Sequence, residues 1–442
     1  MNMYLLFFIA LIPIVWLMVS LGVLKMPGHK TCSITLAITI ALAIIVWKMP
    51  IGQALTATVE GASMAIWPII VVIIAAVFTY NLSIHTKSMD VIKDMMTGIT
   101  TDRRILVLIV AWGFGGFLEA IAGFGTAVAI PASILAALGF DPIFAAIICL
   151  IANTTPTAFG AIGLPVTTLA KVASIDPVTL SYAVGIQLFA LIVVLPLILV
   201  MLTGKSVKAI KGVVFISIAS GLAFAVPELL VAKYLGAELP ALIGSIICII
   251  VTVTIAKIFY KKTAAKDAVN IPVKKALLAW VPFILILAFI LITSTLVPAI
   301  NKPLSAIKTS IQIYTGPHAK ISTFTWIANP GTLIIIATFI GGLIQGAKSR
   351  EIVKVFTDTC KQMSKTAITI LAIVSLAKVM SYSGMITSIA VVLVAATGGF
   401  YPLFAPIIGA LGTFVTGSDT SANVLFGPLQ VEVARNLHMS PY

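Results

Sequence analysis

The sequence predicts an all-α, polytopic integral membrane protein with two related halves, re-entrant hairpins and broken helices. Of its 442 residues, 60% are hydrophobic and only 10% are charged, whereas a soluble domain has about a quarter of its residues charged. The polar residues lie in short islands between apolar runs of roughly 20 residues, the length that crosses a bilayer as a helix. Lipid is therefore the expected surrounding of most of this chain.

The apolar runs predict the membrane segments in order. They cover 3–24, 31–47, 64–84, 105–138, 142–172, 180–202, 212–232, 239–260, 276–297, 331–346, 366–398 and 402–437. The first run lacks a basic stretch before it and a small-residue cleavage site after it, so we expect a retained helix and not a signal peptide.

Several runs are too long for one straight crossing. Run 105–138 has five glycines around Glu119, which weaken a helix at that point and predict a re-entrant hairpin; a second hairpin is predicted at 366–398. Run 142–172 is interrupted by the polar residues 153–157, and run 402–437 by 416–423. These two runs are predicted to be broken helices with unwound backbone at membrane depth.

The charges indicate orientation. The formal charge is +14, but the basic residues form no stripe with interleaved aromatics that would suggest nucleic acid. With the N-terminus outside, most Lys and Arg fall on the cytoplasmic side, as the positive-inside rule requires. The four cysteines are scattered without a CxxC pair, so no metal site, disulfide framework or cofactor is expected.

An internal repeat predicts two related halves, 1–203 and 204–442. The string at 139–148, GFDPIFAAII, recurs at 399–408 as GFYPLFAPII, and Ala170-Lys171 has a counterpart in Ala434-Arg435. The first copy continues into run 180–202, whereas the second ends at Tyr442. By its own repeat the second half is expected to be truncated by about one helix. The number of crossings between the copies favours parallel repeats, although inverted repeats stay open.

Related halves with discontinuous segments are typical of secondary transporters that bind substrate near the midplane. No GxxxxGK[ST] motif for ATP and no HExxH motif for zinc occurs in the sequence. We therefore expect a transporter and not an enzyme. A channel, or an inactive truncated relic, is the alternative from another class.

Glu119 is the first candidate for coupling. A charged residue in the middle of an apolar segment is costly, by roughly 2.5 to 3.5 kcal/mol, and defaults to a functional hypothesis. Glu119 could carry a proton, or its carboxylate could only hold the hairpin tip together through backbone N–H groups. Asp419, in the second polar break, is the other candidate proton carrier.

Lys378 is the candidate cation for an anionic substrate, since it is the only Lys in the interior of run 366–398. The alternative is a permanent salt bridge between Lys378 and Glu119. The repeat aligns Lys378 with Leu118, which is the neighbour of Glu119 in the chain. Lys171 and Arg435 are expected to extend to an interface. Glu60 and Glu228 lie near run ends and are also expected at an interface.

The hairpin tip and the two breaks supply the other candidate substrate contacts. Their hydroxyls, amides and freed backbone groups must face protein, water or ligand, because lipid satisfies none of them. The candidates are Gly123, Gly125, Thr126, Asn153, Thr154, Thr155, Ser418, Thr420, Ser421 and Asn423.

Three of these stretches carry a family resemblance. GGFLEAIAGFGTAVAIP at 115–131, IANTTPTAFG at 151–160 and FVTGSDTSAN at 414–423 closely resemble the bacterial L-lactate permease family, as do 67–82 and 377–380. The resemblance implies proton symport of L-lactate, glycolate and similar 2-hydroxycarboxylates into the cell across the cytoplasmic (inner) membrane. Family members continue beyond the equivalent of Tyr442 with a Gly/Ser-rich stretch and a closing helix, which puts the activity of this chain in question. Within transporters, a sodium-coupled carboxylate carrier is the rival interpretation, because carbonyl- and hydroxyl-rich breaks also suit sodium.

Overall fold

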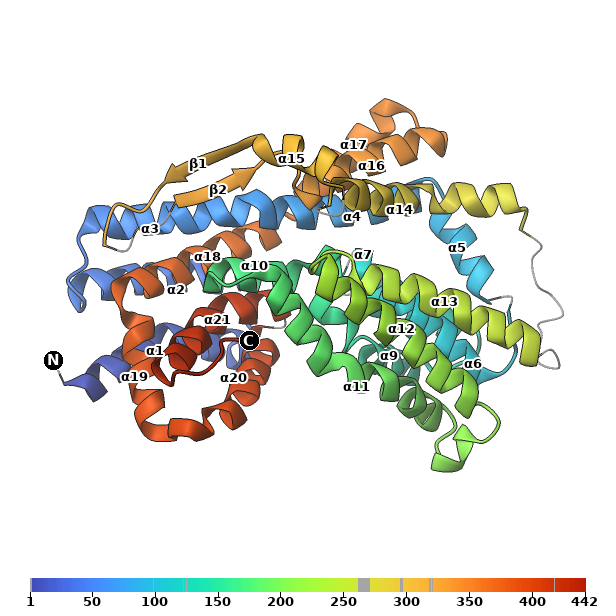
Figure 1. The fold of residues 1–442 in the computed structure, drawn as a ribbon, viewed down its shortest axis with the longest axis horizontal. Coiled ribbons are helices and arrows are strands. Elements are labelled where there is room, and N and C mark those ends of the chain that lie inside the picture. Colours follow the sequence, from blue (N-terminus) through green and yellow to red (C-terminus); the bar gives the residue numbers. More distant parts are fainter. Residues whose placement is uncertain are drawn as a thin grey trace.

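The computed structural model confirms an all-α membrane protein (Figure 1). It describes residues 2–97, 99–121, 123, 126–260, 271–294, 297–317, 319, 321–416 and 418–442. Within these residues, 10 helices are long and apolar enough to cross a membrane, and one bent helix pair would be an eleventh. The chain is thus a multi-pass membrane protein.

The spanning helices follow the predicted runs. They are α1 (Met3–Met18) with a π-helical turn at Val19–Val23, α2 (Gly28–Ile45), α3 (Ile51–Met64) continued by α4 (Val71–His85), α6 (Arg103–Val107) continued by α7 (Gly115–Ile121), α11 (Pro177–Thr203), α12 (Val214–Tyr234), α13 (Pro240–Phe259), α14 (Val273–Thr293), α18 (Ser364–Ser383), and α19 (Met385–Thr397) with α20 (Tyr401–Thr416). The bent pair is α9 (Pro142–Ala152) and α10 (Gly160–Ala173), whose axes differ by 63° at the predicted break.

Shorter elements complete the chain. The helices are α8 (Thr126–Ala137), α16 (Pro330–Ile344) and α21 (Asp419–Asn436). The apolar runs did not predict the polar helices α5 (Ser88–Thr97), α15 (Pro298–Ala306) and α17 (Ser349–Gln362). They also missed an antiparallel hairpin in which β1 (Lys308–Gln312) pairs with β2 (Ile321–Thr325). α15, α17 and β1 are largely exposed, whereas α5 buries Ser88, Met89 and Ile92. The polar side chains of these elements interrupt any long apolar run.

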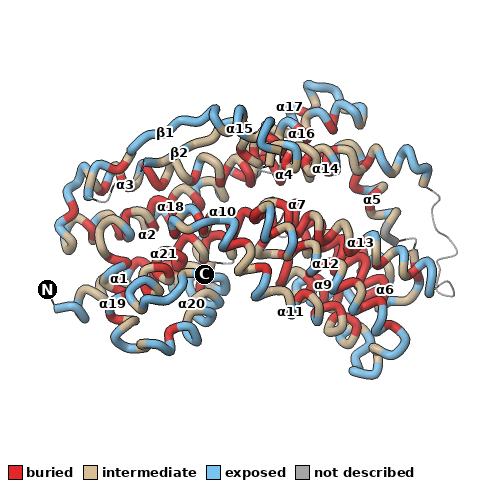
Figure 2. Tube along the Cα trace, in the orientation of Figure 1, coloured by how far each residue is buried: buried red, intermediate tan, exposed pale blue. Residues whose placement is uncertain are grey.

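The helices form two groups that α3 and α4 join (Figure 1). One group contains α7 and α11 to α13, the other contains α1, α2 and α18 to α21, and α10 lies where the groups meet. Burial is densest along α6 and α7 (Figure 2), where 94% of the spanning window is buried against 28 to 39% for α11 to α14. The helix that carries Glu119 is therefore surrounded by protein.

The glycines before Glu119 do not weaken the helix, as the sequence had predicted they would. Residues 103–121 form one continuous helix of 19 residues, so Gly113 and Gly116 do not break it, and Glu119 lies near its C-terminal end. A Cβ on Gly113 would approach Ile249 to 2.9 Å, and one on Gly116 would approach Phe224 to 2.7 Å. These glycines instead allow α12 and α13 to pack closely against this helix.

Positions that lie 259 apart in the chain meet along two segments, one that runs from α3 into α4 and one that leads into α16. The hydroxyls of Thr56 and Thr315 lie 3.1 Å apart, and those of Thr79 and Thr338 lie 2.6 Å apart. Between these pairs, the rings of Trp67 and Trp326 pack with centroids 4.9 Å apart. The two segments therefore run side by side in the same direction.

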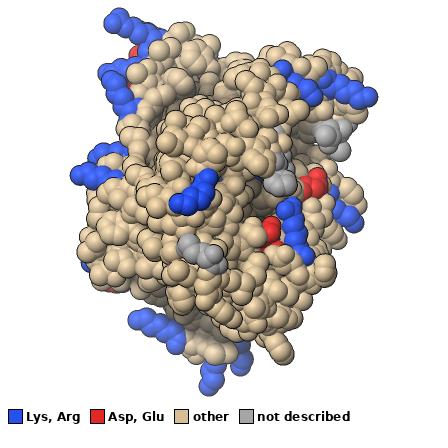
Figure 3. Space-filling model, turned by 90° about the vertical axis from the view of Figure 1, so that its left-hand side faces the viewer, with Lys and Arg blue, Asp and Glu red and all other residues tan. Residues whose placement is uncertain are grey.

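Charged side chains are sparse on the surface. On the face that Figure 3 shows, Lys and Arg project mainly near the edges, acidic groups are few, and uncharged surface covers the rest. Exposed apolar residues such as Phe8, Ile143, Leu403 and Phe414 would be unfavourable in water and are the expected surface in a bilayer.

Candidate functional site

The first polar break forms a compact turn after α9. Asn153 ends the helix, and its Nδ2 donates to Thr157 Oγ1 at 3.2 Å, while Thr157 Oγ1 donates to the carbonyl of Asn153. Thr154 Oγ1 donates to Ile151 O at 2.8 Å. Among the described residues, no hydrogen-bond partner is present for the buried atoms Asn153 Oδ1 and Thr155 Oγ1. These two oxygen atoms of the break can therefore still accept hydrogen bonds.

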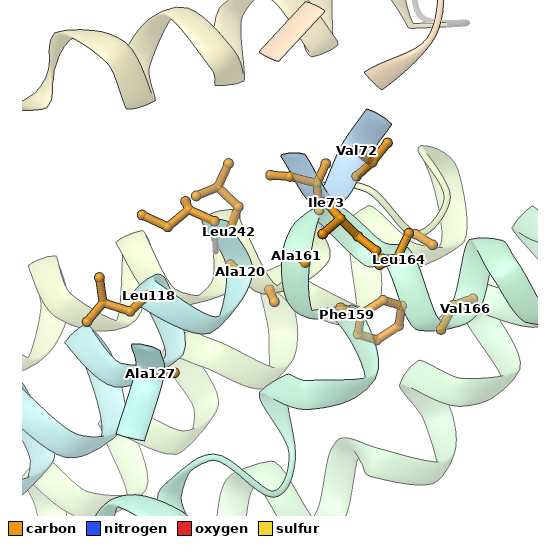
Figure 4. Packing of buried hydrophobic residues seen from close by; sticks show 14 of the residues in the cluster. Val72, Ile73, Leu118, Ala120, Ala127, Phe159, Ala161, Leu164, Val166 and Leu242 are labelled. Carbon is orange, nitrogen blue, oxygen red and sulfur yellow. The ribbon is translucent and has the colours of Figure 1, made fainter. Parts of the chain in front are cut away.

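A left-handed turn leads from this break into α10. Ala161, Ile162 and Gly163 have φ of 44°, 57° and 69°, a conformation that costs an L-residue with a Cβ about 1–3 kcal/mol. Figure 4 shows Phe159, Ala161 and Leu164 along this turn, beside Ala120 at the end of α7. Such strain persists only when surrounding structure holds it, and here it brings the backbone of α10 next to Glu119.

Two glycines enclose the Glu119 carboxylate. A Cβ on Gly123, whose φ is +54°, would lie 3.3 Å from Glu119 Oε1, and one on Gly160 would overlap the carboxylate. The side chains of Asn153 and Asp419 line the same cavity as this carboxylate. Glu119 is 6% exposed. The carboxylate is thus confined between backbone segments of the hairpin tip and the first break.

The second break begins α21. Ser418 accepts from Ser421 N at 3.2 Å and caps the helix, with Asp419 in its first turn. Thr416 Oγ1 donates to the carbonyl of Ser418 at 2.9 Å. Asn423 Nδ2 donates to Pro165 O at 3.3 Å, which ties α21 to α10. A capped helix N-terminus presents backbone N–H groups that favour an anion.

One cavity of about 410 Å³ connects the hairpin tip with both breaks. Of the predicted site residues, those that line it are Glu119, Gly123, Asn153, Ser418, Asp419 and Thr420. Asn423 lines an adjoining cavity of about 190 Å³, which also reaches Asp419. Thr154, Thr155 and Ser421 line neither cavity. Gly125 and the side chain of Thr126 lie outside the described residues.

One interpretation of the sequence paired Lys378 with Glu119, but the structure does not contain this pair. The Nζ of Lys378 lies 3.0 Å from Oε1 of Glu60. The same carboxylate accepts from Tyr382 Oη at 2.8 Å and from Tyr314 N at 3.3 Å. Glu60 is 1% exposed, so its expected place at an interface was wrong. Lys378 thus belongs to a polar cluster outside the Glu119 cavity.

The start of α3 explains the error for Glu60. The apolar run was placed at 64–84, but Pro50 precedes a helix that begins at Ile51, which puts Glu60 well inside it. Pro before a helix start is a usable signal. Gly61 then allows α3 to touch α18, because a Cβ there would lie 2.8 Å from Ser375 N. Ser375 Oγ also donates to Thr58 O at 3.0 Å.

Glu228 also differs from expectation. Glu228 is 1% exposed in α12, and neither of its carboxyl oxygens has a hydrogen-bond partner among the described residues. Lys171 is exposed, as expected, and it also lines two partly open cavities, one of about 200 Å³ with Lys378 and one of about 360 Å³ with Glu238. Arg435 is exposed in the last turn of α21. Lys171 was therefore the functional candidate that sequence reasoning missed.

The described residues offer no cluster of His, Cys, Asp and Glu that could hold a metal ion. The cavity lined by Glu119 and Asp419 can bind a small polar anion near these carboxyl groups. Two carboxyl groups beside one cavity favour protonation when an anion is present, since like charges in a low dielectric repel strongly.

Comparisons with known proteins agree with one another. A sequence model of the family described as L-lactate permease matches residues 6–442. An L-lactate permease of Streptococcus iniae is 57% identical over 435 residues, which are 98% of this chain and 92% of the relative. Glycolate permease GlcA of Escherichia coli (strain K12) is 35% identical over 98% of this chain and 84% of its own length. An L-lactate permease of Bacillus subtilis (strain 168) is 33% identical over the same shares.

Proposed function

This chain belongs to the L-lactate permease family, and from that premise we propose that it imports L-lactate and similar 2-hydroxycarboxylates together with protons. The relatives named above are permeases for L-lactate or glycolate, which supports a small hydroxycarboxylate as substrate. The proposed location is the cytoplasmic membrane of a bacterium.

The observation that carries the proposal is that Glu119 and Asp419 line one cavity together with residues of both polar breaks. Around them, the amide of Asn153 and the hydroxyls of Ser418 and Thr420 can hydrogen-bond to a carboxylate and to its 2-hydroxyl group. An incoming anion next to two carboxylates would be strongly repelled in this buried place. Uptake of a proton by Glu119 or Asp419 removes that repulsion, so substrate and proton enter the cavity together.

This mechanism does not use displacement of Glu119 from Lys378, because Lys378 is paired with Glu60. Glu119 is confined instead by the close backbones at Gly123 and Gly160. The amide of Asn153 lines the same cavity and can donate to Glu119. Protonation of Glu119 would weaken such a bond, since a neutral carboxyl accepts more weakly than a carboxylate. The first break can then respond to the proton as well as to the substrate.

Labelled-lactate uptake into proteoliposomes tests the proposal. We expect accumulation when the external pH is stepped down, at equal rates in sodium and in choline buffers. Glycolate should compete with lactate. Accumulation that needs sodium and ignores the pH step would support the sodium-coupled rival, whose ligands could include the free acceptors Asn153 Oδ1 and Thr155 Oγ1. Conductance without saturable, competable uptake would support a channel.

A further inference from the structure

The cavity of about 200 Å³ near Trp67 contains two lysines, Lys171 and Lys378. Its other polar lining comes from Glu60, Ser174, Ser322 and Thr323. The cavity is small and lies between α3, α10, α18 and β2. None of the proposed proton carriers lines it.

The charges in this cavity do not balance. Glu60 neutralises Lys378 at 3.0 Å, and the Tyr382 ring lies 5.5 Å from the ammonium nitrogen. In the described part of the chain, no carboxylate lies within 4.0 Å of the Lys171 ammonium. Glu238 acts on Lys171 only through a longer-range attraction across the neighbouring cavity of about 360 Å³. One positive charge is therefore left for an anion.

Lys171 also connects the cavities along α10. Lys171, Ser174 and Pro68 line both the 200 Å³ and the 360 Å³ cavity. At the other end of α10, Leu164 lines both the 360 Å³ cavity and the 410 Å³ cavity of Glu119 and Asp419. The three cavities thus follow one helix from its C-terminal end to the polar break before it.

We propose that Lys171 and Lys378 form an anion-binding antechamber, which takes up a small monocarboxylate before it reaches the Glu119 cavity. Lys171 provides the free ammonium group, while Lys378 adds positive potential and is held in place by Glu60. Ser174 and Thr323 can bond to the 2-hydroxyl group. Because Lys171 borders both adjoining cavities, its flexible side chain can follow the carboxylate from one to the next. This inference rests on the proposed transport of hydroxycarboxylates.

Substitution of Lys171 tests the antechamber. Loss of one charged hydrogen-bond donor to a carboxylate should weaken binding by about tenfold or more, so Lys171→Gln should raise the KM for lactate uptake at least that much. Lys171→Arg should stay within a few-fold of the unmodified chain. Lys233→Gln is the matched control, because Lys233, in the last turn of α12, is exposed like Lys171 but lines none of these three cavities. An unchanged KM in Lys171→Gln, or an equal loss in Lys171→Arg, overturns the antechamber.

A second measurement uses the folded protein without transport. Lys171→Cys should be modified by an aminoethyl thiosulfonate reagent, which restores an ammonium group, and lactate should slow the modification. The unmodified chain treated with the same reagent controls for Cys360, whereas Cys32, Cys149 and Cys248 are buried. Modification that lactate does not slow, or that fails to restore lactate affinity, overturns the antechamber. Absence of lactate uptake by the unmodified chain would instead contradict the proposed function.

Discussion

Lys378 and Glu60 form an ion pair between α18 and α3, with 3.0 Å between Nζ and Oε1. Glu60 is 1% exposed, and the Lys378 side chain is 13% exposed. Removing one partner of a buried pair leaves the other charge uncompensated, which costs about 3–5 kcal/mol, whereas replacing both with apolar residues is often neutral. Substitution of either residue therefore tests whether this ion pair holds α3 and α18 together.

The first prediction follows from this pair. Lys378→Met should lower the thermal stability of the detergent-purified protein, with a loss of about 3–5 kcal/mol, and Glu60→Gln in the same chain should recover most of it. Lys354→Met is the control, because Lys354 is exposed on α17. Equal stability of Lys378→Met and the unmodified chain would contradict the ion pair.

The second prediction concerns the space around Glu119. Gly160→Ala should abolish or strongly reduce lactate uptake, because the added methyl group would overlap the Glu119 carboxylate. Gly52→Ala is the matched control, since no atom lies within 4 Å of a Cβ built there. Both variants should be compared for amount in the membrane. Full uptake by Gly160→Ala would show that Glu119 is not confined in this way.

The third prediction concerns proton coupling. Glu119→Gln imitates the protonated carboxyl, so lactate:lactate exchange should continue while accumulation after a pH step is lost. Asp419→Asn should be measured in parallel, because both carboxyls line the same cavity. If Glu119→Gln still accumulates lactate after a pH step and Asp419→Asn does not, Asp419 is the proton carrier.

The fourth prediction concerns the polar breaks. Asn153→Leu and Ser418→Leu should each abolish uptake without preventing membrane insertion, since leucine cannot replace their hydrogen bonds. Thr154→Leu, one position from Asn153, should keep most of the activity, because Thr154 is exposed and does not line the cavity. Similar losses at 153 and 154 would mean that the break is only structurally sensitive.

The apolar runs of the sequence predicted most of the spanning helices. The polar residues 153–157 predicted the break at which the structure bends by 63°. The runs and breaks together also grouped Glu119, Asn153 and Ser418, which the structure places on one cavity. The partner of Lys378 could not be predicted, because it depends on how α3 packs on α18. The three-residue left-handed turn at Ala161 was equally hidden, since alanine and isoleucine carry no signal for positive φ.

The contacts between positions 259 apart have one more consequence. Thr56 meets Thr315, and Thr79 meets Thr338, at the same spacing of 259 positions, and the Trp67 and Trp326 rings pack between them. In a two-fold symmetric pair of subunits, the residues on the axis touch their own copies. These contacts therefore have the geometry of a parallel homodimer interface enclosed in one polypeptide.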